Sequence, residues 1–241
     1  MQNHHTIEKL ETLLVGIPAE QAAHIRALFL TDQLTQLANK QGFLHALGES
    51  LDLTNMFPSL LGIGVVMLDG DSFGAYNKLY GEVQGDTLIE TVGRTIHDFQ
   101  RDTDVVTHFG EEERSALSKK FGGRFGGDEF ATFYLFPLGN GQGRLSFAQI
   151  EHGIFPSILH RLSGAISRTP ISRTPTIVNA EEHYRPDMCM GYNRITATIG
   201  GHLYVSGNHE IIHEPLDLLG KANEALRLVK SNGRGSTHIL P

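Results

Sequence analysis

Cysteine is nearly absent from the sequence: Cys189 is the single thiol among 241 residues. One thiol cannot form an internal disulfide or a cysteine-rich zinc site, so a reducing, cytoplasmic setting is expected. A run of about eighteen apolar residues is also missing, which predicts no membrane-spanning helix. The first residues, Met1 to His5, lack the basic and apolar regions of a signal peptide. These absences predict a soluble protein of the cytoplasm.

Positive charge is in deficit as well. The net charge of −7 argues against a broad nucleic-acid surface, so no nucleic-acid partner is expected, but a few local cations or a metal could still hold a phosphate ligand. The 13 histidines are scattered without an HExxH pair, and we interpret most of them as surface residues and none as a metal ligand. The apolar content of 40% and the charged content of 20% are ordinary for a globular protein. The length fits one large domain, with or without extensions.

Residues 1–30 are interpreted as an N-terminal helical extension. Apolar residues recur at helical spacing over 6–29, with an interruption where Gly16 can end one helix and Pro18 can begin another. Two interpretations remain open: a helix pair that packs on the following domain, or a dimerisation arm. The main domain is expected to occupy residues 31–241.

Strand and helix patterns alternate along this main domain. Residues 61–68 are continuously apolar, which predicts a central strand buried on both faces, and this strand ends in Asp69, Gly70 and Asp71. Helical spacing is found over 41–51, 86–99, 145–165 (with a break at Pro156) and 216–229, whereas 131–136, 195–201 and 203–205 are strand-like. The alternation predicts an α/β sheet with helices packed on it.

Two stretches interrupt the alternation. Residues 110–120 are charged, with acidic residues before basic ones, and suit a short solvated helix. The sequence Ile-Ser-Arg-Thr-Pro occurs twice, at 166–170 and 171–175. Two proline-ended copies predict an exposed, duplicated loop, so residues 166–193 are expected to be an insertion that leaves the core.

The most distinctive stretch is Arg-Phe-Gly-Gly-Asp-Glu-Phe at 124–130. Strand-prone segments flank it at 105–109 and 131–136, and paired glycines accept the positive φ of a tight turn, so a β-hairpin is predicted. Its tip would present the adjacent carboxylates of Asp128 and Glu129. Oxygen ligands on a rigid turn suit a hard cation such as Mg²⁺. An ordinary acidic turn is the alternative for this short motif taken alone.

Further motifs occur in a fixed order around this stretch. They comprise Asp32, Leu34, Thr35, Leu37 and Asn39; Asp69, Asp71 and Phe73; Asn77, Gly85 and Asp86; Thr198 to Gly200; and Lys230, Gly233 and Arg234. Together with residues 124–130, they resemble the motifs of the GGDEF family, the catalytic domain of diguanylate cyclases, over about residues 30–240. The resemblance implies a palm-like α/β (α+β) domain, with a central, mostly antiparallel sheet flanked by helices and the GGDEF hairpin at the active site.

The resemblance also implies a nucleotidyltransferase activity. Two GTP molecules would condense into cyclic di-GMP and two pyrophosphates, as a ribose 3′-hydroxyl attacks an α-phosphate with the help of Mg²⁺ (or Mn²⁺). One site holds one GTP, and the product is symmetric, so a homodimer with facing sites is expected. Cyclic di-GMP is expected both as product and as a candidate inhibitor.

The residue roles follow from the same resemblance. The implied catalytic residues are Asp69, Asp128 and Glu129, and the implied metal ligands are Asp69, the Gly70 carbonyl, Asp128 and Glu129. Glu129 would help to bind metal or activate the 3′-hydroxyl. The implied substrate-binding residues are Asn39, Phe73, Asn77, Asp86, Lys230 and Arg234, of which Asn77 and Asp86 would read guanine, Lys230 and Arg234 would hold phosphates, and Asn39 would approach the ribose or phosphate. Lys230 and Arg234 could instead complement a helix C-terminus, and Asp86 could cap a helix.

The sequence departs from the family pattern at several positions, namely Gln36 (usually glycine), Gly74, Lys78, Glu82, Asn223 and Arg227. None of these departures removes an implied metal ligand. They motivate an alternative function, a non-catalytic regulator that binds GTP or cyclic di-GMP. A third hypothesis, relaxed base choice with ATP as a second substrate, is disfavoured by Asp86, which suits guanine.

An inhibitory product site in this family has the pattern Arg-x-x-Asp, which Arg101 and Asp104 match. Residues 105–125 separate this pattern from Gly126, where the family has only a few residues. An insertion near 108–122 is therefore expected. Either the insertion bulges away and leaves the inhibitory site intact, or it displaces the site.

Overall fold

The structure, a computed structural model, describes residues 2–101, 122–139, 144–169, 195–206, 211–232 and 237–240. Its helices are α1 (Gln2–Leu14), α2 (Ala19–Leu30), α3 (Lys40–Met56), α4 (Phe73–Tyr80), α5 (Glu82–Arg101), α7 (Phe147–Gln149), the π-helical turn η2 (Ile150–Ile154), α8 (Phe155–Ser167) and α9 (Pro215–Asn232). Its strands are β1 (Ala38–Asn39), β2 (Leu61–Gly70), β3 (Gly122–Gly126), β4 (Glu129–Pro137), β5 (Ala197–Val205) and β6 (Thr237–Leu240).

The described strands form one sheet in the order β1-β3-β4-β2-β5-β6. The central strand β2 is antiparallel to β4 and β5, and β3 is antiparallel to β4. The two edge strands, β1 and β6, pair in parallel with β3 and β5. The prediction of a mixed α/β fold with a mostly antiparallel central sheet is therefore confirmed.

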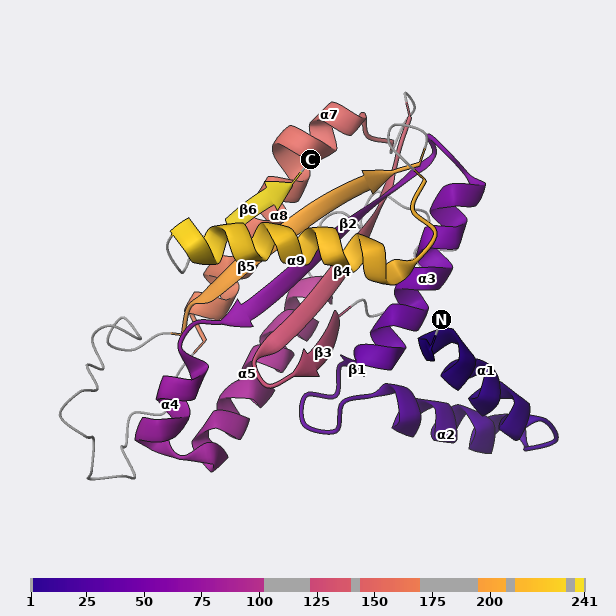
Figure 1. Cartoon of the computed structure of the whole chain (residues 1–241), viewed down its shortest axis with the longest axis horizontal. Helices are drawn as coiled ribbons and strands as arrows, with labels where there is room; N and C mark the ends of the chain where they lie inside the picture. Colours follow the sequence, from indigo (N-terminus) through magenta and orange to yellow (C-terminus); the bar gives the residue numbers. More distant parts are fainter. Residues whose placement is uncertain are drawn as a thin grey trace.

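Helices cover both faces of the sheet (Figure 1). On one face, α3 and α9 pack on Ile63, Val65 and Met67 of β2, and on the other, α5 and α8 pack on Val66 and Leu68. Each face is apolar because side chains alternate along a strand, and β2 is apolar at nearly every position. The continuous apolar run therefore marks a strand buried on both sides, as predicted.

The helix pair α1–α2 has a small apolar cluster of its own, made by Leu10, Leu14 and Ala22. Gly16, with φ of 85°, allows the tight turn between the two helices. The pair lies beside α3, away from the sheet (Figure 1). Within the described part of the chain, no helix combines the length and the apolar character that crossing a bilayer requires.

Several boundaries differ from the sequence prediction. Helix α5 begins at Glu82 rather than Asp86, so Asp86 lies inside the helix and does not cap it. Pro156 does not break a helix: it occupies the first turn of α8, where its missing N–H is tolerated, and η2 widens the turn before it. The elements α4, β1 and β6 were not predicted.

The two interrupting stretches are largely outside the described residues. The predicted strand over 105–109 and the predicted helix over 110–120 lie there, and so does the expected insertion near 108–122, apart from Gly122 in β3. Of the insertion expected over 166–193, residues 166–169 are described and the rest lie outside the described residues. Helix α8 continues to Ser167 and buries Ile166, so the start of that stretch belongs to the packed domain.

Candidate active site

The β3–β4 hairpin turns at Gly126, Gly127 and Asp128. Gly126 and Gly127 have φ values of 141° and 53°, a region that glycine enters without the steric cost of a Cβ atom. Asp128 lies in the turn and is half-buried, whereas Glu129 is the exposed first residue of β4. The predicted hairpin is therefore present, with one of its two carboxylates in the turn and the other on a strand.

The end of β2 meets this turn. In the antiparallel register, Asp69 lies opposite Glu129, so their side chains are on the same face of the sheet. The Gly70 N–H donates to the Asp128 carbonyl at 3.2 Å. A Cβ atom on Gly70 would lie 3.2 Å from the Cβ of Asp128, so glycine lets the Asp128 side chain approach closely. The fold thus brings Asp69, Gly70, Asp128 and Glu129 together.

Burial and the charges around the end of β2 shift the pKa of Asp128. Burial, followed by the negative charge of Asp69, raises the pKa of Asp128 to about 6, and Lys230 opposes the rise. The Lys230 ammonium lies 2.6 Å from an Asp69 carboxylate oxygen. Lys230 is in the last turn of α9, which packs on the same face of the sheet. The geometry therefore collects one cation and several carboxylates at the end of β2.

The oxygen atoms at the end of β2 are suitable ligands for a hard divalent cation. Among the described residues, no group of three or more His, Cys, Asp or Glu side chains is arranged as a metal site. Mg²⁺, however, commonly uses only one or two carboxylates and completes its shell with water and substrate phosphates. Asp69, Asp128 and the Gly70 carbonyl could supply such a partial shell, and a cation would relieve the repulsion that raises the pKa of Asp128.

The residues expected to bind guanine are on adjacent helices. Asn77 is in α4, and its Oδ1 atom is buried without a hydrogen-bond partner among the described residues. Gly85 of α5 lies against it, since a Cβ there would be 1.8 Å from that oxygen. Asp86 follows on α5 and is exposed. Phe73, at the start of α4, lines a narrow crevice of about 10 Å³ together with Gly70 and Asp128.

Asn39, which was expected to approach the ribose or phosphate, has a structural role in this fold. It caps α3: its Oδ1 accepts from the Gly42 N–H at 3.0 Å, and its Nδ2 donates to the Phe29 carbonyl at 2.7 Å. Both polar ends of its side chain are thus already bonded. Of the other predicted residues, Arg101 is the last residue of α5, whereas Asp104 and Arg234 lie outside the described residues.

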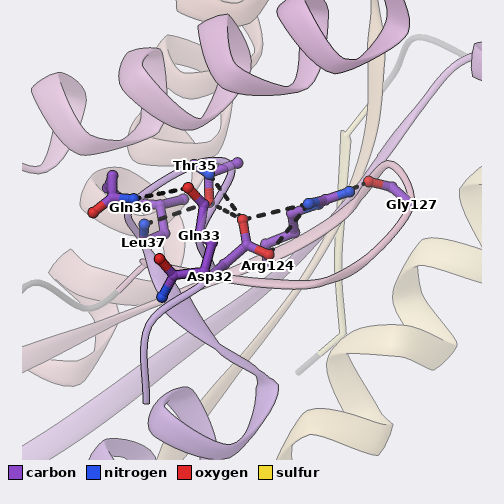
Figure 2. Close-up of polar contacts among 7 residues, drawn as sticks. All are labelled: Asp32, Gln33, Thr35, Gln36, Leu37, Arg124 and Gly127. Carbon is purple, nitrogen blue, oxygen red and sulfur yellow. Dashed lines mark hydrogen bonds and ion pairs between the residues drawn. The ribbon is translucent and has the colours of Figure 1, made fainter. Parts of the chain in front are cut away.

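One interaction was not anticipated from the motifs. Arg124 of β3 donates to both carboxylate oxygens of Asp32, at 3.2 and 3.4 Å, and to the Gly127 carbonyl at 3.0 Å (Figure 2). Burial favours a higher pKa for Asp32, but hydrogen bonds from Thr35 and the charge of Arg124 outweigh it and lower the pKa. Arg124 thus ties the turn to the segment after α2. The sequence shows an acidic residue in one motif and a basic residue in another, but their separation along the chain does not indicate that they form an ion pair.

Comparison with known proteins supports the resemblance. The family model described as "Diguanylate cyclase, GGDEF domain" matches residues 29–120. The diguanylate cyclase VdcA of Vibrio cholerae is 28% identical over 107 residues, which are 44% of this chain and 30% of that protein. The cyclic di-GMP phosphodiesterase NbdA of Pseudomonas aeruginosa is 31% identical over 96 residues, 40% of this chain and 12% of that protein. The matched stretches therefore span less than a third of either relative.

Solved structures resemble the fold over most of the chain. The coiled coil and GGDEF domain of DgcB from Caulobacter crescentus, in complex with c-di-GMP, has a TM-score of 0.64 at 19% identity and covers 99% of this chain and 97% of its own. The GGDEF domain of YfiN from Pseudomonas aeruginosa has a TM-score of 0.56 at 22% identity, covering 88% and 94%. The resemblance to the GGDEF family is confirmed, and the described fold is that of a GGDEF domain.

Proposed function

We propose that this chain is a diguanylate cyclase, a nucleotidyltransferase that condenses two GTP into cyclic di-GMP and two pyrophosphates. The observation that carries the proposal is the meeting of Asp69, Gly70 and Asp128 at the end of β2, beside Glu129 and Lys230. The named activity of VdcA and the c-di-GMP bound to DgcB are consistent with this assignment.

In this proposal, Asp69, Asp128 and the Gly70 carbonyl hold Mg²⁺ or Mn²⁺. When bound, the ion would supply positive charge that stabilises the charge developing on the reacting phosphate. Binding requires the ionised form of Asp128, whose raised pKa makes metal affinity fall as the pH drops below about 6. Glu129 lies exposed at the edge of the site, where it can help to hold the metal or accept the proton of the 3′-hydroxyl.

Lys230 is assigned to the phosphates, together with Arg234, which lies outside the described residues. In the described structure, the Lys230 ammonium is paired with Asp69 at 2.6 Å. A metal on Asp69 would compete for that carboxylate, so the ammonium would become free to contact a phosphate oxygen in its place. Lysine is suited to this exchange because its flexible stem carries a compact charge.

Guanine recognition is assigned to α4 and α5, with Phe73 among the residues that line the crevice. The Asn77 Oδ1, which has no hydrogen-bond partner within the described ranges, is an acceptor that could take a guanine N–H. Asp86 is an exposed acceptor nearby on α5 and suits the adjacent N1–H and N2–H₂ donors of guanine. Adenine lacks this pair of donors, so the arrangement favours GTP over ATP.

The decisive experiment incubates purified protein with GTP and Mg²⁺ and separates the products by chromatography and mass spectrometry. We expect cyclic di-GMP from the parent and none from Glu129→Gln, which keeps the shape of the side chain but removes its charge. Asp52→Asn, an exposed change on α3, is the matched control and should keep full activity. Absence of product from the parent, across metals and protein concentrations, would refute the cyclase.

A symmetric product from two GTP molecules requires two facing sites, so the proposed enzyme acts as a homodimer. The helix pair α1–α2 exposes Leu13, Val15 and Leu28, apolar side chains that suit contact with a second copy. Specific activity should therefore fall on dilution in step with the dimer fraction measured by analytical ultracentrifugation. Unchanged specific activity at concentrations where the protein is monomeric would contradict the dimer.

The second candidate is a non-catalytic regulator that binds GTP or cyclic di-GMP. The family-model match ends at residue 120, before the Gly-Gly-Asp-Glu turn, and several family positions are altered. Binding of GTP without turnover would select this function. Product inhibition through Arg101 and Asp104 is a separate proposal, which Arg101→Ala tests: inhibition by cyclic di-GMP that survives this change would rule out the site.

A further inference from the structure

Asp71 follows the Asp69–Gly70 segment but does not join the carboxylate group at the hairpin. Strand β2 ends at Gly70, and the chain then turns, with Ser72 in the left-handed region at φ of 60°. Asp71 is only 3% exposed. The turn directs its carboxylate toward β5, whereas Asp69 faces Glu129 and Lys230. The two aspartates of this motif therefore have different surroundings.

Two threonine hydroxyls donate hydrogen bonds to the Asp71 carboxylate. Thr196 Oγ1 donates to one oxygen at 2.7 Å, and Thr198 Oγ1 donates to the other at 2.6 Å. The Asp71 N–H adds a third bond, to the Thr196 carbonyl at 2.9 Å. A buried carboxylate with both oxygens bonded in this way is anchored to the start of β5.

The anchored residue is next to the proposed metal ligands. Gly70 N–H is bonded to the Asp128 carbonyl at 3.2 Å, and Asp71 is bonded to Thr196 and Thr198. The short segment 69–71 is therefore hydrogen-bonded to the hairpin on one side and to β5 on the other. The pairing of β2 with β5 already sets Asp69 opposite Thr198 and Gly70 opposite Ala197. The side-chain bonds of Asp71 extend this attachment one residue beyond the end of β2.

We infer that Asp71 is a positioning residue, which holds the Asp69 carboxylate and the Gly70 carbonyl toward the metal through Thr196 and Thr198, and is not itself a ligand. The inference rests on the proposed function for its catalytic consequence. The structural part of the inference, that these hydrogen bonds hold segment 69–71 in place, does not depend on that function. Residues that orient metal ligands commonly alter metal affinity by roughly 10- to 100-fold when changed.

The test measures Mn²⁺ binding to nucleotide-free protein by electron paramagnetic resonance. Asp71→Asn and Thr198→Val should each weaken binding by about tenfold or more, and the double variant should be less affected than the product of the two single effects. Thr54→Val is the matched control, because it removes a fully buried threonine hydroxyl whose bond, to the Ser50 carbonyl, lies within α3. It should leave Mn²⁺ affinity unchanged.

Two outcomes of this measurement would overturn the inference. If Asp71→Asn weakened binding as much as Asp69→Asn while Thr198→Val had no effect, Asp71 would be a direct ligand. If Asp71→Asn and Thr198→Val lowered the melting temperature but left Mn²⁺ affinity unchanged, the residue would serve the fold alone.

Amide hydrogen exchange in metal-free protein separates this inference from the proposed function. Exchange at residues 70 and 71 should accelerate about tenfold or more in Asp71→Asn and Thr198→Val, and not in Thr54→Val. This result would support a hydrogen-bonded 69–71 segment even if the parent made no cyclic di-GMP and bound no Mn²⁺. Unchanged exchange at these two amides would overturn the inference even in an active cyclase.

Discussion

Gln36 is held in the left-handed backbone region, with φ of 59°. Its N–H donates to the Asp32 carbonyl at 2.8 Å, so the conformation closes the turn that leads to β1. This position is usually glycine in the GGDEF family, and the backbone angle gives the physical reason, since a Cβ atom is disfavoured there. Glutamine is accommodated at a cost in stability.

Replacing Gln36 with glycine should therefore stabilise the protein. We expect Gln36→Gly to raise the free energy of unfolding by about 0.5–1 kcal/mol, because relief of the left-handed strain exceeds the entropy that glycine loses on folding. Urea denaturation measures the change. Gln33→Gly, at an exposed neighbour without positive φ, should be neutral or destabilising. A Gln36→Gly variant less stable than the parent would contradict this explanation.

Asp128 should make the metal-free protein sensitive to pH. Its pKa is about 6 in the folded state against 3.8 ordinarily, so the folded state retains the proton to higher pH than the unfolded state does. The resulting contribution to stability is present below about pH 4 and is lost as the pH rises through 6. It is on the order of 1 kcal/mol, since partial exposure screens the interaction.

The measurement is urea denaturation in EDTA between pH 4 and 8. Asp128→Asn has no charge to develop, so it should gain stability relative to the parent as the pH rises across this interval. Asp52→Asn, an exposed carboxylate-to-amide change on α3, is the matched control. Parallel pH profiles for Asp128→Asn and the parent would contradict a pKa of Asp128 that burial and the charge of Asp69 raise.

At the scale of elements, two ion pairs in different environments join neighbouring segments: one links α1 to α2, and the other links β3 to the segment after α2. Arg26 of α2 lies 2.6 Å from Glu11 of α1, with side chains 41% and 47% exposed. Arg124 of β3 lies 3.2 Å from Asp32, with side chains 14% and 21% exposed. The Arg124–Asp32 pair should contribute more to the free energy of unfolding than the Arg26–Glu11 pair, although its distance is longer. Water and salt screen the exposed Arg26–Glu11 pair, and Arg124 also donates to the Gly127 carbonyl.

We expect Arg124→Gln to lower the free energy of unfolding by about 1–2 kcal/mol, because it leaves the half-buried Asp32 without its charged partner. Arg26→Gln should produce no measurable change. A double-mutant cycle with Asp32→Asn isolates the pair from other effects of the substitution. Equal losses for Arg124→Gln and Arg26→Gln would indicate that burial does not distinguish the two pairs.

At the scale of the whole molecule, the packing of α9 on the sheet depends on Gly200 of β5. A Cβ atom there would lie 2.0 Å from the backbone nitrogen of Leu226 and 2.6 Å from the Ala222 carbonyl oxygen. These are backbone atoms and cannot rotate away. The contact also sets the position of Lys230 at the far end of α9, so packing and the candidate active site are linked.

Gly200→Ala should therefore separate α9 from β5 and lower the free energy of unfolding by roughly 3 kcal/mol, with weaker GTP binding through Lys230. Gly220→Ala, on α9 with open space around the position, should instead raise stability by about 0.5–1 kcal/mol, because alanine favours a helix interior. Thermal melting and GTP titration measure both effects. A tolerated Gly200→Ala would contradict the close contact.

Much of the fold was predictable from local patterns. The apolar run at 61–68 predicted β2, helical spacing predicted α2, α3 and α9, and paired glycines predicted the hairpin turn. The register of side chains in such segments follows from the period of a helix or strand, which neighbouring residues alone determine. Short elements such as β1 were missed, because two residues are too few for a period to show.

Local sequence patterns were enough to predict the longer strands and helices, the acidic turn, and the residue types that could hold a metal. The contacts between distant residues became known from the three-dimensional fold: Arg124 with Asp32, Lys230 with Asp69, and Asp71 with Thr196 and Thr198. These contacts follow from the strand order β3-β4-β2-β5 and from the packing of α9. Local periodicity does not specify that order, because it depends on how apolar faces from the whole chain are buried together.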